Sequence, residues 1–171
     1  QEYLSRVYAK GYGCDIVCTR SFNHIGPGQT ERFVVSSFVK QAVEVSQKKK
    51  SEIACGRMDI IRDFIDVRDV ICAYDVILEK GKSGEAYNVC NGKGHSLKEI
   101  LEYVCGQLNI PVATREDKAL MRPIENTVIV GNNEKLRRLG FQPKYDLFRS
   151  LDDMIQWWQE KGLTVSSVQE R

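Results

Sequence analysis

The chain has 171 residues, of which 42% are hydrophobic and 28% charged, a balance typical of one globular domain with a substantial core. Lysine and arginine number 25 against 23 aspartate and glutamate residues, so the formal net charge is only +2. This charge gives no argument for binding to nucleic acid or to a membrane. No apolar run approaches the roughly 20 residues of a membrane-spanning helix.

Cysteine and histidine spacing argues against a metal site. The six cysteines are Cys14, Cys18, Cys55, Cys72, Cys90 and Cys105. No two of them form a C-x-x-C pair, and His24 and His95 do not match the spacing of a zinc-binding helix. We interpret most of the cysteines as small buried residues in a reducing compartment, which favours the cytoplasm.

Hydrophobic periodicity predicts a helix at the start of the chain. Leu4, Val7 and Tyr8 fall on one face of it, and it should end near the glycines at positions 11 and 13. Because no capping residue precedes this helix, we expect the chain to begin inside it and to lack the first half of its fold. A buried strand is predicted over 15–20, and a loop follows over 21–29.

Helices and strands alternate through the middle of the chain. A helix is predicted over 33–47, and strands over 53–55, 62–66 and 86–90. Asp66 should cap the helix that follows the second of these strands. The face of that helix expected to point inward carries Val70, Ile71, Tyr74, Ile77 and Leu78.

The last third of the chain continues this alternation. Ser96 and Glu99 form a capping box for a helix. A short strand over 111–114, a long loop over 115–126 and a short helix over 134–139 follow. Asp146 should cap a last helix. Helices alternating with strands favour a parallel α/β arrangement, and the small strand count indicates part of a larger doubly wound fold.

Polar side chains follow one of the predicted strands directly. Asn23 and His24 come after the strand over 15–20, and ligands of open α/β sheets bind just outside the carboxyl ends of strands. The neighbouring glycines and Pro27 would form a tight loop that lets backbone approach a ligand. From residue types alone, the simpler alternative is favoured, in which Asn23 caps a turn and His24 packs beneath it.

Two distant arginines are candidates for binding a diphosphate. Arg62 precedes an apolar strand, and Arg122 lies in the long loop together with Glu125. Two converging guanidinium groups would offer bidentate hydrogen bonds to phosphate, and Glu125 could accept from ribose hydroxyls. The alternative is an ordinary salt bridge of Arg62 with a neighbouring aspartate.

Several catalytic signatures are absent from the sequence. No G-x-G-x-x-G fingerprint follows a strand, and no phosphate-binding P-loop or nucleophile elbow occurs. The sequence also shows no pair of carboxylates of the kind that general acid and base catalysis uses. The motifs therefore indicate binding and do not by themselves indicate a reaction.

Five segments resemble, in the same order, motifs of the extended short-chain dehydrogenase/reductase family, in its nucleotide-sugar branch. Residues 20–29 resemble the loop after the sixth strand of that family. Residues 62–70 resemble its R-D-F-x-D-V-x-D-V block, and residues 87–92 its Y-N-V-G-S-G block, with a cysteine in place of a glycine. Residues 122–125 and 139–143 resemble its R-P-x-E/D and L-G-W-x-P motifs. The resemblance extends from the first residue to about position 161.

This resemblance implies a fold and a division of labour. The chain would be the substrate-binding half, residues 1–171, with the last strands of a Rossmann-like doubly wound parallel sheet and a small α/β substrate-binding domain. The cofactor-binding half, with its glycine-rich fingerprint and catalytic Tyr-x-x-x-Lys pair, would precede the first residue. No catalytic residue is therefore expected here, and the fragment alone should be inactive. The complete enzyme would use NADP or NAD and form a homodimer.

The resemblance also implies a role for each candidate residue. Asn23 would contact the diphosphate or sugar of the substrate, and His24 would lie beside the nicotinamide. Arg62 and Arg122 would clamp the diphosphate, and Glu125 would hold the ribose hydroxyls.

The F-N-H sequence points to family members that act on GDP-linked sugars. Within them, the H-I-G-P-G-Q segment resembles that of reductases of GDP-6-deoxy-4-keto-D-mannose, and the resemblance implies GDP-D-rhamnose as the product. A GDP-mannose 4,6-dehydratase or another nucleotide-sugar epimerase or dehydratase is the alternative. A stand-alone nucleotide-sugar-binding module without catalysis is an alternative of another class.

Overall fold

The computed structural model describes residues 1–121 and 126–166, with side chains to Lys161. The helices are α1 (Glu2–Tyr12), α2 (Val34–Ser46), α3 (Val67–Lys80), α4 (Leu97–Gln107), α5 (Glu134–Arg137) and α6 (Leu147–Ser166), with one 3-10 turn at Lys118–Leu120. The strands are β1 (Cys18–Ser21), β2 (Asn23–Ile25), β3 (Ile53–Cys55), β4 (Ile61–Asp66), β5 (Ala86–Val89), β6 (Gly94–Ser96), β7 (Thr114–Glu116) and β8 (Val128–Ile129). None of the described helices is long and apolar enough to cross a membrane.

The strands form three small sheets that are mostly parallel. Strand β1 pairs with β5, and β3 pairs with β7, both in parallel. Between these pairs, β2 and β8 run parallel to β4, while β6 runs antiparallel to it. This confirms the predicted α/β class, in which helices join strands that run the same way.

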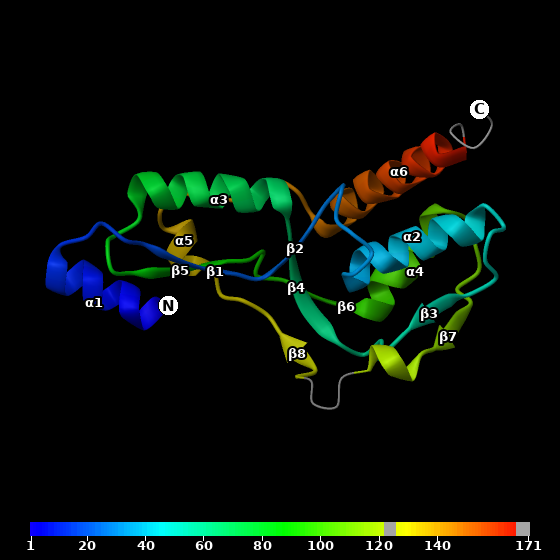
Figure 1. Ribbon diagram of the computed structural model, residues 1–171, viewed down its shortest axis with the longest axis horizontal. Helices are drawn as coiled ribbons and strands as arrows, with labels where there is room; N and C mark the ends of the chain where they lie inside the picture. Colours follow the sequence, from blue (N-terminus) through cyan, green and yellow to red (C-terminus); the bar gives the residue numbers. More distant parts are fainter. Residues whose placement is uncertain (122–125, 167–171) are drawn as a thin grey trace.

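Figure 1 shows the elements in two groups on either side of β2 and β4. Helices α1, α3 and α5 lie with β1 and β5 at one end. Helices α2, α4 and α6 lie with β3 and β7 at the other end. The two central strands therefore connect the groups, and residues on them can face either one.

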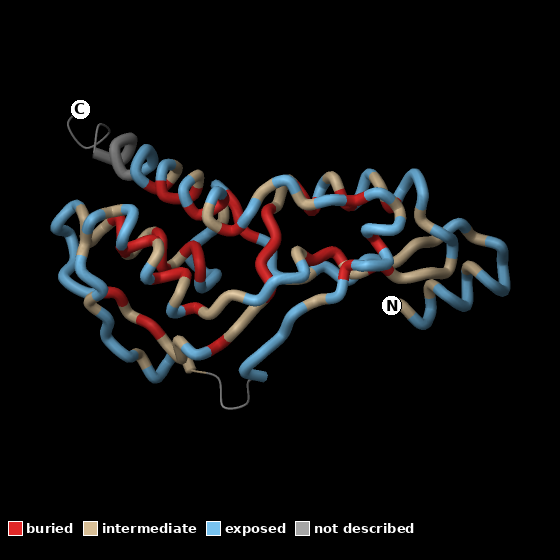
Figure 2. Tube along the Cα trace, turned by 180° about the vertical axis from the view of Figure 1, so that it is seen from behind, coloured by how far each residue is buried: buried red, intermediate tan, exposed pale blue. Residues whose placement is uncertain are grey.

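Strand β4 forms a wall between two hydrophobic cores. Phe64 packs into the core of α2, α4 and α6, while its neighbour Ile65 packs into the core of α3 and β5. Successive side chains of a strand point to opposite faces, so one strand supplies both cores. The buried segments in Figure 2 accordingly gather in both halves and along the strand between them.

The predicted capping residues are confirmed. The carboxylate of Asp66 accepts a hydrogen bond from the backbone N–H of Arg68 at 2.8 Å, and Ser96 Oγ accepts from Glu99 N at 3.0 Å. Asp146 accepts from Arg149 N at 2.8 Å at the start of α6. Each bond satisfies one of the backbone donors that a helix leaves unpaired in its first turn.

The inward face predicted for α3 is partly wrong. Val70, Ala73 and Ile77 are the buried stripe, whereas Ile71, Tyr74 and Leu78 are exposed. The two apolar stripes are offset by one residue, about 100° around the helix, and both have helical spacing. Periodicity therefore could not decide which stripe faces the sheet. The apolar face of α1 and most of β1 are also exposed, because no described element covers them.

Residues 23–25 were expected in a loop but form strand β2. Their extended backbone pairs in parallel with β4, from Asn23 opposite Phe64 to Ile25 opposite Asp66. The segment was missed because a strand of three residues has too little periodicity to recognise. The long loop predicted over 115–126 likewise contains part of β7 and a 3-10 turn in its described residues.

Asp66 should make stability depend on acid pH. Burial alone raises the pKa of its carboxyl, but hydrogen bonds from Arg68 and Ser150 outweigh burial and hold the pKa below its ordinary value. An aspartate with a lowered folded pKa contributes stability above its unfolded pKa and loses it as pH falls through the folded pKa. We expect stability in urea to decline below about pH 4.

The Asp66→Asn variant should be less stable than the wild type at pH 7, by about 1–3 kcal/mol. It should also lose less stability between pH 7 and pH 3, because it lacks the carboxyl that titrates. Asp75→Asn, at an exposed position of α3, serves as the control. An Asp66→Asn variant that declines as steeply as the wild type would contradict this role.

Candidate functional site

Two adjacent strands bring three of the predicted site residues together. Asn23 and His24 lie on β2, and Arg62 lies on β4, which pairs with β2. Arg62 and Phe64 are two residues apart on one strand, so their side chains point to the same face. All four residues line one pocket.

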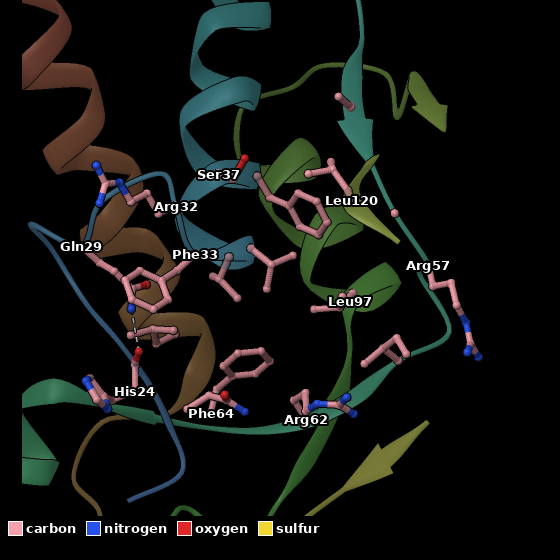
Figure 3. Close-up of a pocket in the computed structure, with 18 of the residues that line it drawn as sticks. His24, Gln29, Arg32, Phe33, Ser37, Arg57, Arg62, Phe64, Leu97 and Leu120 are labelled. Carbon is pink, nitrogen blue, oxygen red and sulfur yellow. Dashed lines mark hydrogen bonds between the residues drawn. The ribbon is translucent and has the colours of Figure 1, made fainter. Parts of the chain in front are cut away.

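The pocket is a cavity of about 560 Å³ between the central strands and helix α2. Figure 3 shows His24, Phe64 and Arg62 along one side, with Phe33 and Ser37 of the α2 region across from them. Leu97 of α4 and Leu120 of the 3-10 turn complete the apolar part of the lining. The lining therefore combines apolar side chains with polar ones, which also include Gln29, Arg32 and Arg57, as is typical of a small-molecule site.

The two aspartates near Arg62 in the sequence, Asp63 and Asp66, bond to other groups. Asp66 pairs with Arg68, at 2.7 Å. The guanidinium Nη1 of Arg62 donates to Ile61 O at 2.9 Å and to Thr127 O at 3.3 Å. The guanidinium lies at the pocket, and these two backbone carbonyls help to hold it there.

Asp63 faces away from the pocket and ties the strand ends together. It is fully buried, and its carboxylate accepts from the backbone N–H groups of Asn91, Gly92 and Gly131 at 2.8 to 3.1 Å. Two segments far apart in the sequence, at 91–92 and at 131, therefore converge on one carboxylate. This cluster fixes β4 next to the ends of β5 and β8, and so supports the strand that carries Arg62.

The simpler alternatives for Asn23 and His24 do not describe the structure. Asn23 is in a strand and exposed, and its amide donates to Asp63 O at 3.4 Å, which is a long contact. The side chain of His24 is also exposed and packs beneath nothing. Both residues line the pocket, and their roles in binding stay predictions.

A tight turn follows β2 and shapes the pocket edge. Gln29 N donates to Gly26 O at 3.2 Å, and Gly28 has φ +89°. Proline at the second position and glycine with positive φ at the third are typical of a type II turn. Gly26 packs against Val67, which leaves no room there for a side chain. The turn therefore returns the chain to the start of α2.

Arg122 and Glu125 lie outside the described residues. The lining also contains aromatic side chains, among them Phe33 and Phe38, and sequence reasoning did not assign Phe38 to a site. Phe33 is the residue just before α2 and is exposed.

The described residues hold no cluster of three His, Cys, Asp or Glu side chains that could bind a metal ion. All six cysteines are free thiols. Cys90 is fully buried between the cores, and burial raises the pKa of its thiol to about 12. A thiol with so high a pKa is a poor nucleophile at neutral pH, so Cys90 has a packing role.

A family model described as GDP-mannose 4,6 dehydratase matches residues 1–154. The chain belongs to this family. The order of motifs that resembled the nucleotide-sugar branch of the extended short-chain dehydrogenases/reductases is thereby confirmed. GDP-6-deoxy-D-mannose reductase of Pseudomonas aeruginosa is 32% identical over 151 residues, which are 87% of this chain and 50% of that protein. CDP-abequose synthase of Salmonella typhimurium is 28% identical over 158 residues, or 90% of this chain and 52% of that protein.

Solved structures of this family have the same fold. The structure of RMD from Pseudomonas aeruginosa complexed with NADPH superposes with a TM-score of 0.87 at 30% identity, over 94% of this chain and 54% of that one. A putative epimerase from Burkholderia cenocepacia gives a TM-score of 0.83 at 29% identity, over 93% and 51%. The Rossmann-like fold is thus confirmed, and the chain spans about half the length of the relatives it matches.

Proposed function

We propose that this chain is the nucleotide-sugar-binding half of an NAD(P)-dependent reductase that acts on a GDP-linked 4-keto sugar. The observation that supports this most is the convergence of Asn23, His24 and Arg62 from two strands on one pocket. The similarity to GDP-6-deoxy-D-mannose reductase favours GDP-6-deoxy-4-keto-D-mannose as the substrate, and hence GDP-D-rhamnose as the product.

The proposed roles follow the chemistry of each side chain. Arg62, together with Arg122, binds the diphosphate, because guanidinium groups offer paired donors to phosphate oxygens. Asn23 donates to the diphosphate or the sugar. Glu125 accepts from the ribose hydroxyls, and His24 lies at the edge of the nicotinamide. A cavity of about 560 Å³ is within the range of nucleotide-sized ligand sites.

NADP or NAD would be held mainly by the other half of the complete enzyme. The exposed imidazole of His24 at the pocket rim fits an edge contact with a nicotinamide, and the chain has no glycine-rich fingerprint of its own. The bound cofactor supplies the hydride for reduction. The residues described here bind and orient the sugar nucleotide, and the Tyr-x-x-x-Lys pair of the other half handles the proton.

A dehydratase is the second candidate, because the matching family model carries the description of GDP-mannose 4,6 dehydratase. The complete enzyme separates the two. With NADPH and the 4-keto sugar nucleotide, a reductase consumes NADPH. The consumption is measured as a loss of absorbance at about 340 nm, where reduced nicotinamide absorbs. A dehydratase converts GDP-mannose without consuming NADPH, and that outcome would replace the reductase proposal.

Binding of GDP by the isolated chain tests the enzyme-half proposal against a non-catalytic module. A half-enzyme lacks most of the cofactor pocket, so calorimetry should show weak binding of GDP and GDP-mannose, in the range of about 0.1–1 mM. Sub-micromolar binding would favour the module. No detectable binding of either ligand would reject both.

We further propose that residues 1–171 act as one substrate-binding half of a cytoplasmic, homodimeric enzyme. The six free thiols agree with a reducing compartment. The exposed apolar faces of α1 and α3 agree with burial against another part of the enzyme or a second copy.

A further inference from the structure

A chain of hydrogen bonds runs from the last helix to the polar edge of the pocket. The indole Nε1–H of Trp158 on α6 donates to Ser36 Oγ on α2 at 3.3 Å. Ser36 Oγ donates to Gln29 O at 2.6 Å, and Gln29 Nε2 donates to His24 O at 2.8 Å. The last helix is thus linked, through Ser36 and Gln29, to the segment that carries Asn23 and His24, which is far from it in the sequence.

The middle of this series of hydrogen bonds is shielded from water. Ser36 is fully buried and Trp158 nearly so. Hydrogen bonds in such surroundings are stronger than in water and restrict the groups they join. Ser36 and Trp158 do not line the pocket, so neither can contact a ligand there directly.

Gln29 closes the turn after β2 with both its backbone and its side chain. Its backbone N–H bonds Gly26 O, and its side-chain amide reaches back to the carbonyl of His24. The other end of that amide, Oε1, is buried and finds no hydrogen-bond partner among the residues that the structure describes. A buried acceptor without a partner destabilises the fold. The stabilising contribution of the Gln29 side chain is therefore the hydrogen bond that it donates to His24 O.

We propose that Trp158, Ser36 and Gln29 form a positioning relay, in which helix α6 fixes the turn at 26–29 and thereby holds Asn23 and His24 at the pocket. This inference rests on the proposed function only in the choice of GDP as the probe. The three are positioning residues, since they act through the backbone of the turn. The relay also makes Trp158 a reporter of pocket occupancy.

Nuclear magnetic resonance of the ¹⁵N-labelled chain tests the relay in two steps. Without ligand, Ser36→Ala should shift the backbone amide signals of residues 24–29 and the indole signal of Trp158. With GDP, the wild-type indole signal of Trp158 should move more than that of Trp157, which has no part in the relay. In Ser36→Ala this response should disappear, and the affinity for GDP should fall by about tenfold.

Two further variants separate positioning from folding. Trp158→Phe keeps the aromatic bulk but removes the donor, and should weaken GDP binding severalfold if Ser36→Ala does not fold. Ser46→Ala is the matched control, because Ser46 lies on the same helix and bonds Val43 O at 2.8 Å. It should change neither the signals of 24–29 nor the affinity.

The outcomes are distinct. Unchanged amide signals at 24–29 in both Ser36→Ala and Trp158→Phe would overturn the relay, and so would altered signals with unchanged affinity for GDP. If the wild-type chain binds no GDP, the proposed function fails, and the ligand-free spectra still decide whether the relay holds the turn.

Discussion

Replacing Asp63 by alanine should destabilise the protein by on the order of 3–5 kcal/mol. The fully buried carboxylate accepts three backbone N–H bonds from Asn91, Gly92 and Gly131. Alanine would leave these donors buried without an acceptor, and each such donor costs about 1–3 kcal/mol. Urea denaturation followed by circular dichroism measures the loss.

Asp75→Ala is the matched control for this variant, since Asp75 is exposed on α3. It should stay within about 0.5 kcal/mol of the wild type, as most surface substitutions do. An Asp63→Ala variant that lost less than about 1 kcal/mol would show that the three bonds contribute little. The position of strand β4 between the two cores would then be stabilised by the packing of Phe64 and Ile65.

Replacing Arg62 by alanine should weaken binding of GDP-mannose by roughly ten- to a hundredfold. The change removes a cation at the pocket, and a charge-assisted hydrogen bond contributes about 1.5–3 kcal/mol, where about 1.4 kcal/mol is a factor of ten. Calorimetric titration of the complete enzyme, wild type and folded variant, measures the affinity. Cofactor binding by the complete enzyme should change little, because Arg62 is proposed to contact only the substrate.

Arg138→Ala controls for the loss of one positive charge. Its side chain is 81% exposed beside α5, where it pairs loosely with Glu134 at 4.0 Å. This variant should bind GDP-mannose like the wild type. If Arg62→Ala kept its affinity within about twofold, Arg62 would have no part in binding the diphosphate.

Local patterns predicted much of the fold. The features predicted correctly depend on residues within a few positions of one another. They are strand 53–55, the helix caps at Asp66, Ser96 and Asp146, and the left-handed glycine after α1. Long-range pairing was not predictable in the same way. Strand β2 has only three residues and exists because β4 lies beside it, and nothing in its own sequence shows that partner.

The site was predictable in part for the same reason. Asn23 and His24 follow one predicted strand, and Arg62 lies at the start of another. Their position at strand ends could therefore be predicted from the sequence. The buried hydrogen bond from Trp158 to Ser36 joins residues that are 122 positions apart. No sequence pattern reveals such a contact, because a buried serine and a helical tryptophan are each explained by packing alone.

A crystal structure of this chain with GDP-mannose tests the central claim most directly. The account predicts that the diphosphate lies in the pocket between β4 and α2, with its oxygens within about 3.2 Å of the side-chain nitrogens of Arg62 or Asn23. Nucleotide bound elsewhere on the chain, with the Arg62 guanidinium facing no phosphate, would contradict it.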